Sequence, residues 1–472
     1  MEDYRMSTDE SMNIERFDKL LRVGESFDII KRELDFEAFS GVMYYIDGFV
    51  KAETMQKLIM HLMGAKNGGD GESGAARRFA RSVPTVEVDT QNDLRAAAVA
   101  VLSGCTAFFS QSFCGECLII DARTYPAREA SEPENDKVMR GSRDGFVETL
   151  IFNTAMLRRR IRDPRLTVKY VSVGSESKTD VALCYMEGIA DREYVDTLLE
   201  KLRSCKAHSV TLGHRSLAEA LLKKGWLNPF PKIRATERPD AAAASVLEGS
   251  VAVICDNSPE VMLFPVSYFS FLQETDDFYF PPLTGSYLRI VRHIVFLLTV
   301  FITPVWYLLL LHADTLPQYL MFLIPKSPGQ LPILFQLLLT EFILDGLKLA
   351  SLNTPDALSS SLSVVGGLLL GDFAVQTGWL CSDVTLYMSF VAIANFTQSS
   401  YELGYAFKFV RIITLVLTAL FDIVGFCIGA FIGFFLVCTN KTADGKRRYL
   451  YPLCPFNGKA LLSLLLRLKK RH

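Results

Sequence analysis

The spacing of hydrophobic residues changes near Arg292, and this change divides the chain into two kinds of structure. Before Arg292, strand-like apolar runs alternate with segments that carry apolar residues at helical spacing, as in GVMYYIDGF (residues 41–49) followed by KAETMQKLIMHLM (residues 51–63). Such alternation is typical of packed α/β layers. After Arg292, long apolar runs dominate. We therefore predict an α/β cytosolic half made of two small α/β subdomains, followed by an α-helical multi-pass membrane domain.

Prolines, glycines and charge runs mark the expected boundaries of these parts. The further strands predicted in the α/β half are residues 84–88, CTAFFSQ, CLIIDAR, LTVKYVSVG, VALCYMEGI, SVTL, SVAVICD and EVMLFPV. The further helices are residues 92–102, 191–203, 216–224 and 241–247. The predicted order is a flexible N-terminus (1–25), a first α/β subdomain (26–123), a linker (124–143), a linking helix with the second α/β subdomain (144–287), a transmembrane domain (288–440) and a basic cytosolic tail (441–472).

The membrane half offers several candidate spans. Residues 290–312 are long enough to cross a bilayer, and Arg289 and Arg292 place the start of this segment in the cytoplasm. Pro304 should kink the helix and free a carbonyl that a neighbouring residue must satisfy. The other candidates are residues 331–350, 361–380, 384–398 and 409–437.

Charges at the two ends of the membrane half constrain the number of crossings. The basic tail should also be cytosolic, so the number must be even, whereas five candidates are present. Treating residues 331–350 as a re-entrant or laterally packed segment leaves four crossings, with Lys408 and Arg411 on the outer side against the usual charge bias. Folding the last segment into a short hairpin gives six.

Ionisable residues interrupt the apolar stretch 331–380, and they are its most informative feature. Such groups are costly at membrane depth and usually face a protein interior or a watery path. Rings of acidic side chains can select cations, which favours a pore. The alternative is structural, with Asp345 paired to Lys348 and Asp372 capping or bonding a neighbouring helix. The candidate pore or polar membrane residues are Glu341, Asp345, Lys348 and Asp372, with Asp356 nearby.

Glycines and arginines supply two further sets of candidates. Gly425, Gly429 and Gly433 have the small-xxx-small spacing that lets membrane helices pack closely, and Gly367 and Gly371 repeat it. In the predicted linking helix, which Asp144 should cap and Pro164 should end, the last turns carry Arg158, Arg159, Arg160 and Arg162. These arginines form either a solvated helix end or a docking surface for acidic lipids or a partner subunit.

Composition and residue spacing argue against a disulfide-bonded, metal-binding or catalytic protein. The chain has 472 residues, a net charge of −2 and ten cysteines without disulfide-like spacing, and its first residues lack an apolar signal segment. Cys114 and Cys117 form a C-x-x-C pair that could bind zinc or act in redox chemistry, but no second pair or nearby histidine supports this, which favours a structural role. We expect no catalytic constellation, no cofactor, no metal and no nucleic-acid partner.

Several long blocks resemble one protein family. They include EPENDKVMRGSRDGFVETLIFNTAMLRRRIRDPRL, NPFPKIRATERPD, LNTPDALSSSLSVVGGLLLGDFAVQTGWL, QSSYELGYAFKFVRI and YLYPLCPFNG, in this order. Over nearly the whole chain from about residue 26, the sequence resembles the A-subunit family of GerA-type spore germination receptors.

The resemblance implies a multi-pass protein of the spore inner membrane with both termini in the cytosol. It also implies a homo-oligomer that works with a transporter-like B-type membrane subunit, as an ion-channel or ion-release component that promotes or amplifies germination. The alternative is a non-conducting scaffold that clusters germination receptors through its cytosolic half and its intramembrane glycines.

Overall fold

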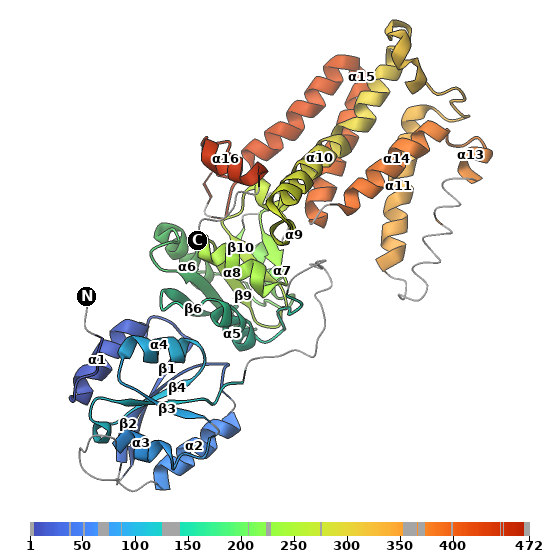
Figure 1. Cartoon of the computed structure of the whole chain (residues 1–472). Coiled ribbons are helices and arrows are strands. Elements are labelled where there is room, and N and C mark those ends of the chain that lie inside the picture. Colours follow the sequence, from blue (N-terminus) through green and yellow to red (C-terminus); the bar gives the residue numbers. More distant parts are fainter. Residues whose placement is uncertain are drawn as a thin grey trace. The chain divides into compact units, whose positions relative to one another are not determined.

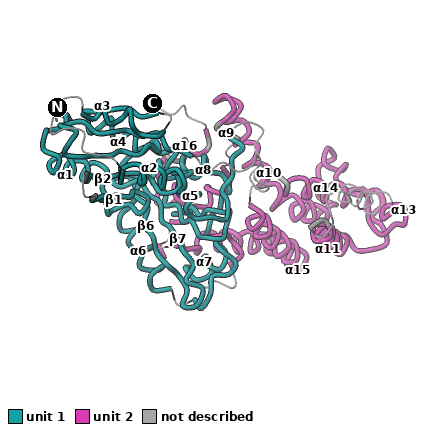
Figure 2. The backbone as a smooth tube through the Cα atoms, turned by 90° about the horizontal axis from the view of Figure 1, so that it is seen from below, with its two compact units in different colours: residues 1–224, 233–266 teal, residues 225–232, 267–472 magenta. Residues whose placement is uncertain are grey.

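The computed structural model describes residues 4–36, 39–50, 52–64, 75–85, 87–124, 142–205, 207–222, 228–273, 276–352, 366, 373–397, 400–443, 445–446 and 448–466. The chain forms two compact units, coloured separately in Figure 2. Unit 1 comprises Met1–Lys224 with Ile233–Val266, and unit 2 comprises Gly225–Lys232 with Ser267–His472. Residues 225–232 thus belong with unit 2, whereas the sequence suggested that they lie within the second α/β subdomain.

Unit 1 contains two five-stranded antiparallel sheets (Figure 1). The first has the order β1-β2-β4-β5-β3, with strands β1 (Ile29–Phe36), β2 (Phe39–Ile46), β3 (Val88–Gln91), β4 (Thr106–Phe109) and β5 (Cys117–Ile120). The second has the order β6-β7-β9-β10-β8, with strands β6 (Leu166–Val173), β7 (Thr179–Met186), β8 (Arg234–Thr236), β9 (Val251–Cys255) and β10 (Val261–Phe264). The two subdomains of the predicted α/β region are therefore present.

The two sheets belong to repeats of one topology. Each repeat begins with a helix and a hairpin, continues through two helices, a strand and a helix, and ends with a second hairpin. The helices are α1 (Glu10–Leu21), α2 (Ala52–Gly64), α3 (Ala75–Ala80) and α4 (Leu94–Leu102), then α5 (Leu150–Arg160), α6 (Arg192–Arg203), α7 (His214–Leu221) and α8 (Pro239–Leu247).

A buried asparagine in the first helix of each repeat shows the same correspondence. The Asn13 side chain bonds the backbone N–H and carbonyl of Ser7, and the Asn153 side chain bonds those of Val147, in both cases six residues back. Each amide thus satisfies backbone groups that would otherwise be left without partners inside the fold.

Helices cover both faces of the first sheet. Phe17 of α1 and Leu94 of α4 contribute to one hydrophobic cluster, and Leu58 of α2 contributes to another on the opposite face. α5 and α8 cover the second sheet with a third cluster. Ala155 of α5 belongs to the first cluster, so α5 joins the two repeats.

Four sequence expectations for unit 1 are wrong. The strand expected at residues 84–88 is shifted along the chain, because β3 runs from Val88 to Gln91. Residues 10–21 are not frayed but form α1, which Asp9 caps and which buries Phe17 and Leu21. The linking helix begins at Leu150 with Thr149 as its N-cap residue, while Asp144 instead accepts hydrogen bonds from Arg160. The SVTL segment is a loop and turn rather than a strand.

The C-x-x-C pair occupies a turn and the strand that follows it. Cys114 has a left-handed backbone with φ of 48°, and Cys117 begins β5 with its side chain fully buried. Burial raises the pKa of the Cys117 thiol well above its usual range, which keeps it in the unreactive protonated form.

His214 fixes the start of α7 to the loop between β9 and β10. Its Nδ1 lies 2.9 Å from the Ser258 hydroxyl, and its Nε2 lies 2.6 Å from a Glu260 carboxylate oxygen. Ser258 is only 3% exposed, so this serine–histidine–glutamate arrangement anchors a loop and shields the hydroxyl from solvent. The hydrogen bond from His214 lowers the pKa of Glu260.

The lowered pKa predicts that the Glu260 carboxylate contributes a pH-dependent part of the stability. The contribution should be present above the unfolded pKa of about 4.3 and should be lost as pH falls through the lower folded value. Melting of the full chain at pH 7 and at lower pH should therefore show a smaller difference for Glu260→Gln than for the wild type. Glu176→Gln is the matched control, because its pair with His208 is exposed and 3.8 Å long; an equal loss in all three proteins would contradict the prediction.

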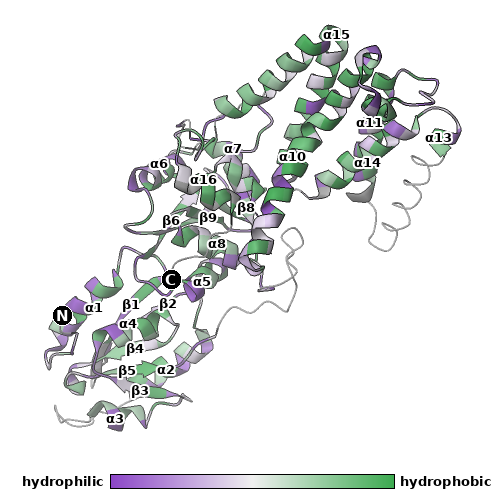
Figure 3. Ribbon diagram, turned by 45° about the horizontal axis from the view of Figure 1, so that its top comes forward, coloured by the Kyte–Doolittle hydropathy of each residue, from purple (hydrophilic) through white to green (hydrophobic). Residues whose placement is uncertain are grey.

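Unit 2 is helical, and its long helices are predominantly hydrophobic (Figure 3). Its elements are η2 (Tyr268–Leu272), α9 (Asp276–Tyr279), α10 (Pro282–Leu311), η3 (Ala313–Thr315), η4 (Gln318–Leu323), α11 (Ile333–Leu352), α13 (Ala374–Gln376), α14 (Ser382–Phe396), α15 (Tyr401–Thr439) and α16 (Gly458–Leu465). Within the described residues, α10 and α15 are long and apolar enough to cross a membrane.

α15 is a helical hairpin rather than one straight helix. Asp422 interrupts it with φ of 57° and ψ of −134°, a combination that residues other than glycine rarely adopt. We call residues 401–421 the first arm and residues 423–439 the second arm. A Cβ added to Gly425, Gly429 or Gly433 would meet Leu417, Thr414 or Val410 respectively, so the arms run antiparallel and in contact. A hairpin in this segment is what the alternative with six membrane crossings requires.

Replacing Gly429 by alanine should separate the arms and destabilise the bundle by about 1–3 kcal/mol. The new methyl carbon would lie 2.6 Å from the Thr414 Cα, and backbone atoms cannot move aside easily. Gly346→Ala in α11 is the matched control, because no atom lies within 4 Å of its added Cβ. Thermal unfolding in detergent compares the two; equal melting temperatures would contradict close packing at Gly429.

Candidate functional site

Two pairs of opposite charges meet between α11 and the first arm of α15. Glu341 and Asp345 are four residues apart on α11, and Lys408 and Arg411 are three residues apart on the first arm, so each pair shares one helical face. The two helices place Glu341 opposite Arg411 and Asp345 opposite Lys408. We call these four residues the ion-pair cluster.

Arg411 is the most enclosed member of the cluster, with a side chain that is 1% exposed. Its Nε donates to a Glu341 carboxylate oxygen at 2.7 Å, and its Nη1 donates to the Thr299 carbonyl of α10 at 2.8 Å. Pro304 has no N–H for the Val300 carbonyl, and the Thr299 carbonyl that Arg411 reaches is the neighbouring one in the same turn. Arg411 therefore ties together α10, α11 and α15.

Lys408 extends the cluster toward the other end of α11. Its Nζ donates to the Asp345 carboxylate, lies 3.6 Å from Glu341 Oε2, and lies 3.3 Å from the Glu341 carbonyl oxygen. Asp345 is the most accessible member, with 32% of its side chain exposed. Two carboxylates and two cations cancel, so the cluster is charge-balanced.

The Asp345 carboxylate contacts Lys408, a partner that the sequence did not indicate. Lys348 places its Nζ 5.7 Å from the centre of the Tyr405 ring. The cluster contains Lys408 and Arg411, which were noted only as charges on the unexpected side of a membrane. Asp356, Asp372, Gly367 and Gly371 lie outside the described residues.

A second buried charge group lies at the start of α10. Asp277 accepts from Arg289 Nε at 3.2 Å and from Arg292 Nη1 at 2.8 Å, and all three side chains are almost fully buried. Arg292 also donates to the Leu272 carbonyl. The two arginines that were interpreted as a positive flank are thus buried partners of an aspartate.

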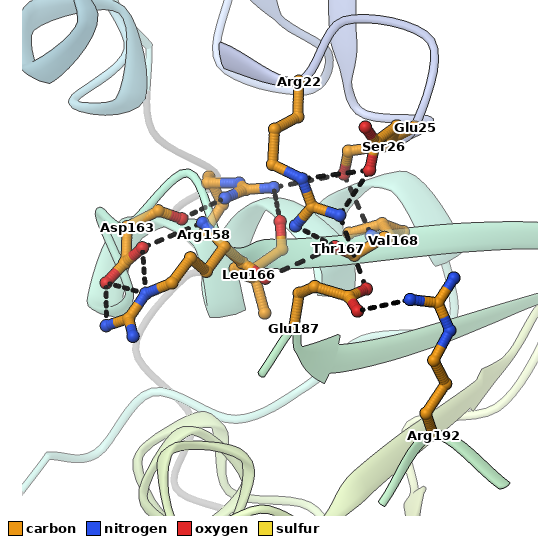
Figure 4. Close-up of polar contacts among 11 residues, drawn as sticks. Arg22, Glu25, Ser26, Arg158, Asp163, Leu166, Thr167, Val168, Glu187 and Arg192 are labelled. Atoms are coloured by element: carbon orange, nitrogen blue, oxygen red, sulfur yellow. Dashed lines mark hydrogen bonds and ion pairs between the residues drawn. The ribbon is translucent and has the colours of Figure 1, made fainter. Parts of the chain in front are cut away.

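The arginines of the predicted docking surface separate into buried and exposed side chains. Arg158 is fully buried. Its Nε donates to one carboxylate oxygen of Asp28 at 2.7 Å, and its Nη2 donates to the other at 3.0 Å. It also reaches the Ser26 hydroxyl and the carbonyls of Asp163 and Leu166 (Figure 4). Arg158 is therefore removed from any docking surface, because its charge is used to join the two repeats of unit 1.

The other arginines lie nearer solvent. Arg160 pairs with Asp144, whereas Arg159 and Arg162 are exposed. A docking surface here would therefore use the exposed charges of Arg159 and Arg162 rather than all four arginines.

Comparison with known proteins relates these features to a family. Residues 16–472 match the family described as Bacillus/Clostridium GerA spore germination protein. Stage V sporulation protein AF of Bacillus subtilis (strain 168) is 35% identical over 99% of this chain and 94% of its own length. Spore germination protein KA of the same organism is 26% identical over 94% of this chain and 82% of its own.

Two further similarities were found. The uncharacterized membrane protein YfkQ of Bacillus subtilis (strain 168) is 28% identical over 93% of this chain and 85% of its own length. The crystal structure of the N-terminal domain of the A subunit of the Bacillus megaterium spore germinant receptor GerK3 is 23% identical, with a TM-score of 0.41, and covers 56% of this chain and 97% of that domain.

The match over nearly the whole chain confirms the family predicted from the sequence. Stage V sporulation protein AF and spore germination protein KA carry names from sporulation and spore germination. The chain belongs to the GerA family of Bacillus/Clostridium spore germination proteins.

Proposed function

We propose that this protein is a subunit of a spore inner-membrane complex that releases ions during germination, and that the ion-pair cluster holds the ion path closed. The observation that carries the proposal is a charge-balanced cluster buried between helices that are otherwise apolar. Ionisable groups in such a setting commonly belong to an ion path.

The cluster fits a gate better than a selectivity filter. An acidic ring selects cations through unpaired negative charge, whereas Glu341 and Asp345 are neutralised by Arg411 and Lys408. Paired charges give α11 and the first arm two discrete arrangements, joined or separated, which is what a switching element requires. In this proposal, separating the pairs exposes two carboxylates to the path and permits cations to pass.

We further propose six crossings with both termini in the cytosol, in a homo-oligomer that also contains a B-type membrane subunit. The hairpin of α15 supplies two crossings and removes the need for a re-entrant α11. Phe335, Phe342 and Leu349 are exposed at seven-residue spacing along α11, where lipid or a neighbouring subunit would cover them. The mass of the complex in detergent distinguishes a ring of this chain from a single mixed pair.

The scaffold alternative needs glycines and arginines that are available to bind other proteins, and several of these residues have partners within this chain. Gly425, Gly429 and Gly433 contact the first arm of the same chain, so they are occupied within the hairpin. Arg158 is buried within unit 1.

Potassium and sodium flux from liposomes that contain the purified full chain tests the proposal. A closed gate predicts low flux in the wild type and a clear increase in variants that break the cluster, with the same helix content. A scaffold predicts identical flux from wild-type, cluster-variant and empty liposomes, and that result would overturn the proposal.

A further inference from the structure

One short segment leaves unit 1 and joins the membrane helices before the chain returns. Gly225–Lys232 belong to unit 2, and the chain returns to unit 1 at Ile233. Its described part, residues 228–232, reads Asn-Pro-Phe-Pro-Lys, and we call it the strap. Prolines at 229 and 231 fix φ at two of its five positions, which makes it stiffer than an ordinary loop.

Three hydrogen bonds attach the strap to the end of the second arm and the chain beyond it. Asn228 Nδ2 donates to the Leu436 carbonyl at 2.8 Å. Asn440 Nδ2 donates to the Phe230 carbonyl at 3.4 Å, and the Tyr449 hydroxyl donates to the Pro231 carbonyl at 2.8 Å. The strap is therefore bound through its backbone as well as its side chains.

Phe230 packs its ring against an aromatic cluster formed by the first arm, α10 and η2. It is 3% exposed and meets the Phe407 ring edge-on, with centroids 6.0 Å apart. Phe407 also contacts Phe296 of α10 at 5.2 Å and Tyr268 at 6.3 Å. Edge-to-face rings of this kind hold a preferred geometry, so moving one ring displaces the next.

Phe407 is directly followed by Lys408 and lies about one helical turn from Arg411. The ring that Phe230 touches is therefore part of the same short helical segment that carries both cations of the ion-pair cluster. A shift of this segment changes the distances from Lys408 to Asp345 and from Arg411 to Glu341 together.

We propose that the strap positions the first arm for the ion-pair cluster, with Phe230 as the positioning residue, and that movements of unit 1 reach the cluster through it. This inference rests on the proposed function for its biological meaning, but its geometric part stands by itself. Unit 1 is connected to unit 2 in the sequence on both sides of Gly225–Lys232 and again between Val266 and Ser267, and of these connections the strap is the one that contacts the first arm through Phe230.

Zero-length carbodiimide coupling of the full chain in detergent tests the positioning directly. The reagent joins the Lys408 amine to the Asp345 carboxylate only when the two groups are in contact, and mass spectrometry measures the cross-linked peptide. We expect Phe230→Ala to lower the yield about tenfold, since small misplacements strongly slow such reactions. Phe230→Tyr, which keeps the ring, should restore it. Phe434→Ala removes a ring that is 64% exposed on the second arm and is the matched control.

The outcomes separate this inference from the proposed function. An unchanged cross-link yield in Phe230→Ala overturns the positioning role, even if cluster variants alter ion flux. A lowered yield without any change in flux supports the positioning role and counts against the gate. If Phe230→Ala fails to fold, the double variant Asn228→Ala with Tyr449→Phe removes two strap hydrogen bonds instead; it should also lower the yield, and an unchanged yield there overturns the inference.

Discussion

Replacing Glu341 by glutamine is expected to destabilise unit 2 by about 3 kcal/mol, because it leaves Arg411 buried without an opposite charge of its own. Arg411 would keep its bond to the Thr299 carbonyl, and Asp345 would remain the one carboxylate for two cations. The same variant should raise potassium flux from liposomes, since the joined state of α11 and the first arm loses its strongest contact.

Thermal unfolding in detergent and flux from liposomes measure the two effects of Glu341→Gln. Asp314→Asn, which removes an exposed acid from η3, is the control for loss of one negative charge. Adding Arg411→Met to Glu341→Gln should recover stability, because a neutral pair leaves no uncompensated charge. Wild-type melting of Glu341→Gln would show that the cluster does not hold the helices together.

Replacing Asp28 by asparagine should lower the free energy of unfolding of unit 1 by about 3–5 kcal/mol. Asp28 and Arg158 are both almost completely buried, and the pair joins the segment before β1 to α5. The Ser26 hydroxyl bonds Asp28 and accepts from the Val168 N–H, so the change also disturbs the contact with β6. The two repeats should separate at lower temperature.

Melting and limited proteolysis of the full chain measure this loss. Glu15→Gln is the control, because its pair with Lys19 is exposed on both sides and should leave melting unchanged. Asp28→Leu combined with Arg158→Met should regain much of the lost stability. If Asp28→Asn melted like the wild type, the buried pair would not be what joins the repeats.

Most strands of unit 1 could be predicted because their residues are apolar in continuous or alternating runs. β9 and β10 are buried at every position, as VAVIC and VMLF suggest. α6 was also predictable, since Asp191 caps it and its apolar residues have helical spacing. α1 was missed because charged residues dominate its sequence, although Asp9 and the spacing of Phe17 and Leu21 were usable signals.

The repeat of one topology was missed because the repeats share few residues. The one visible signal was an asparagine in each leading helix, in SMNIERF and IFNTAML, which the structure shows bonding the backbone six residues back. The start of α5 was misplaced because Phe146 and Val147 fit a helical stripe, whereas Phe146 N–H donates to the Glu237 carbonyl instead.

The acids of the candidate site could be predicted, but their partners could not. Glu341 and Asp345 are conspicuous in an apolar stretch, while Lys408 and Arg411 lie more than sixty residues further on. Sequence spacing shows that each pair shares a helical face and does not show which helices meet. Arg158 presents the same difficulty, because a run of arginines does not reveal which one turns inward to a distant aspartate.

The central claim is that contact between Asp345 and Lys408 closes the ion path. Potassium flux from liposomes should be measured for Asp345→Lys, for Lys408→Asp and for the double variant that exchanges the two charges. The account predicts high flux for each single variant and near wild-type flux for the exchanged pair, since opposite charges face each other again. Flux that is the same in all four proteins, or that stays high in the exchanged pair, would contradict it.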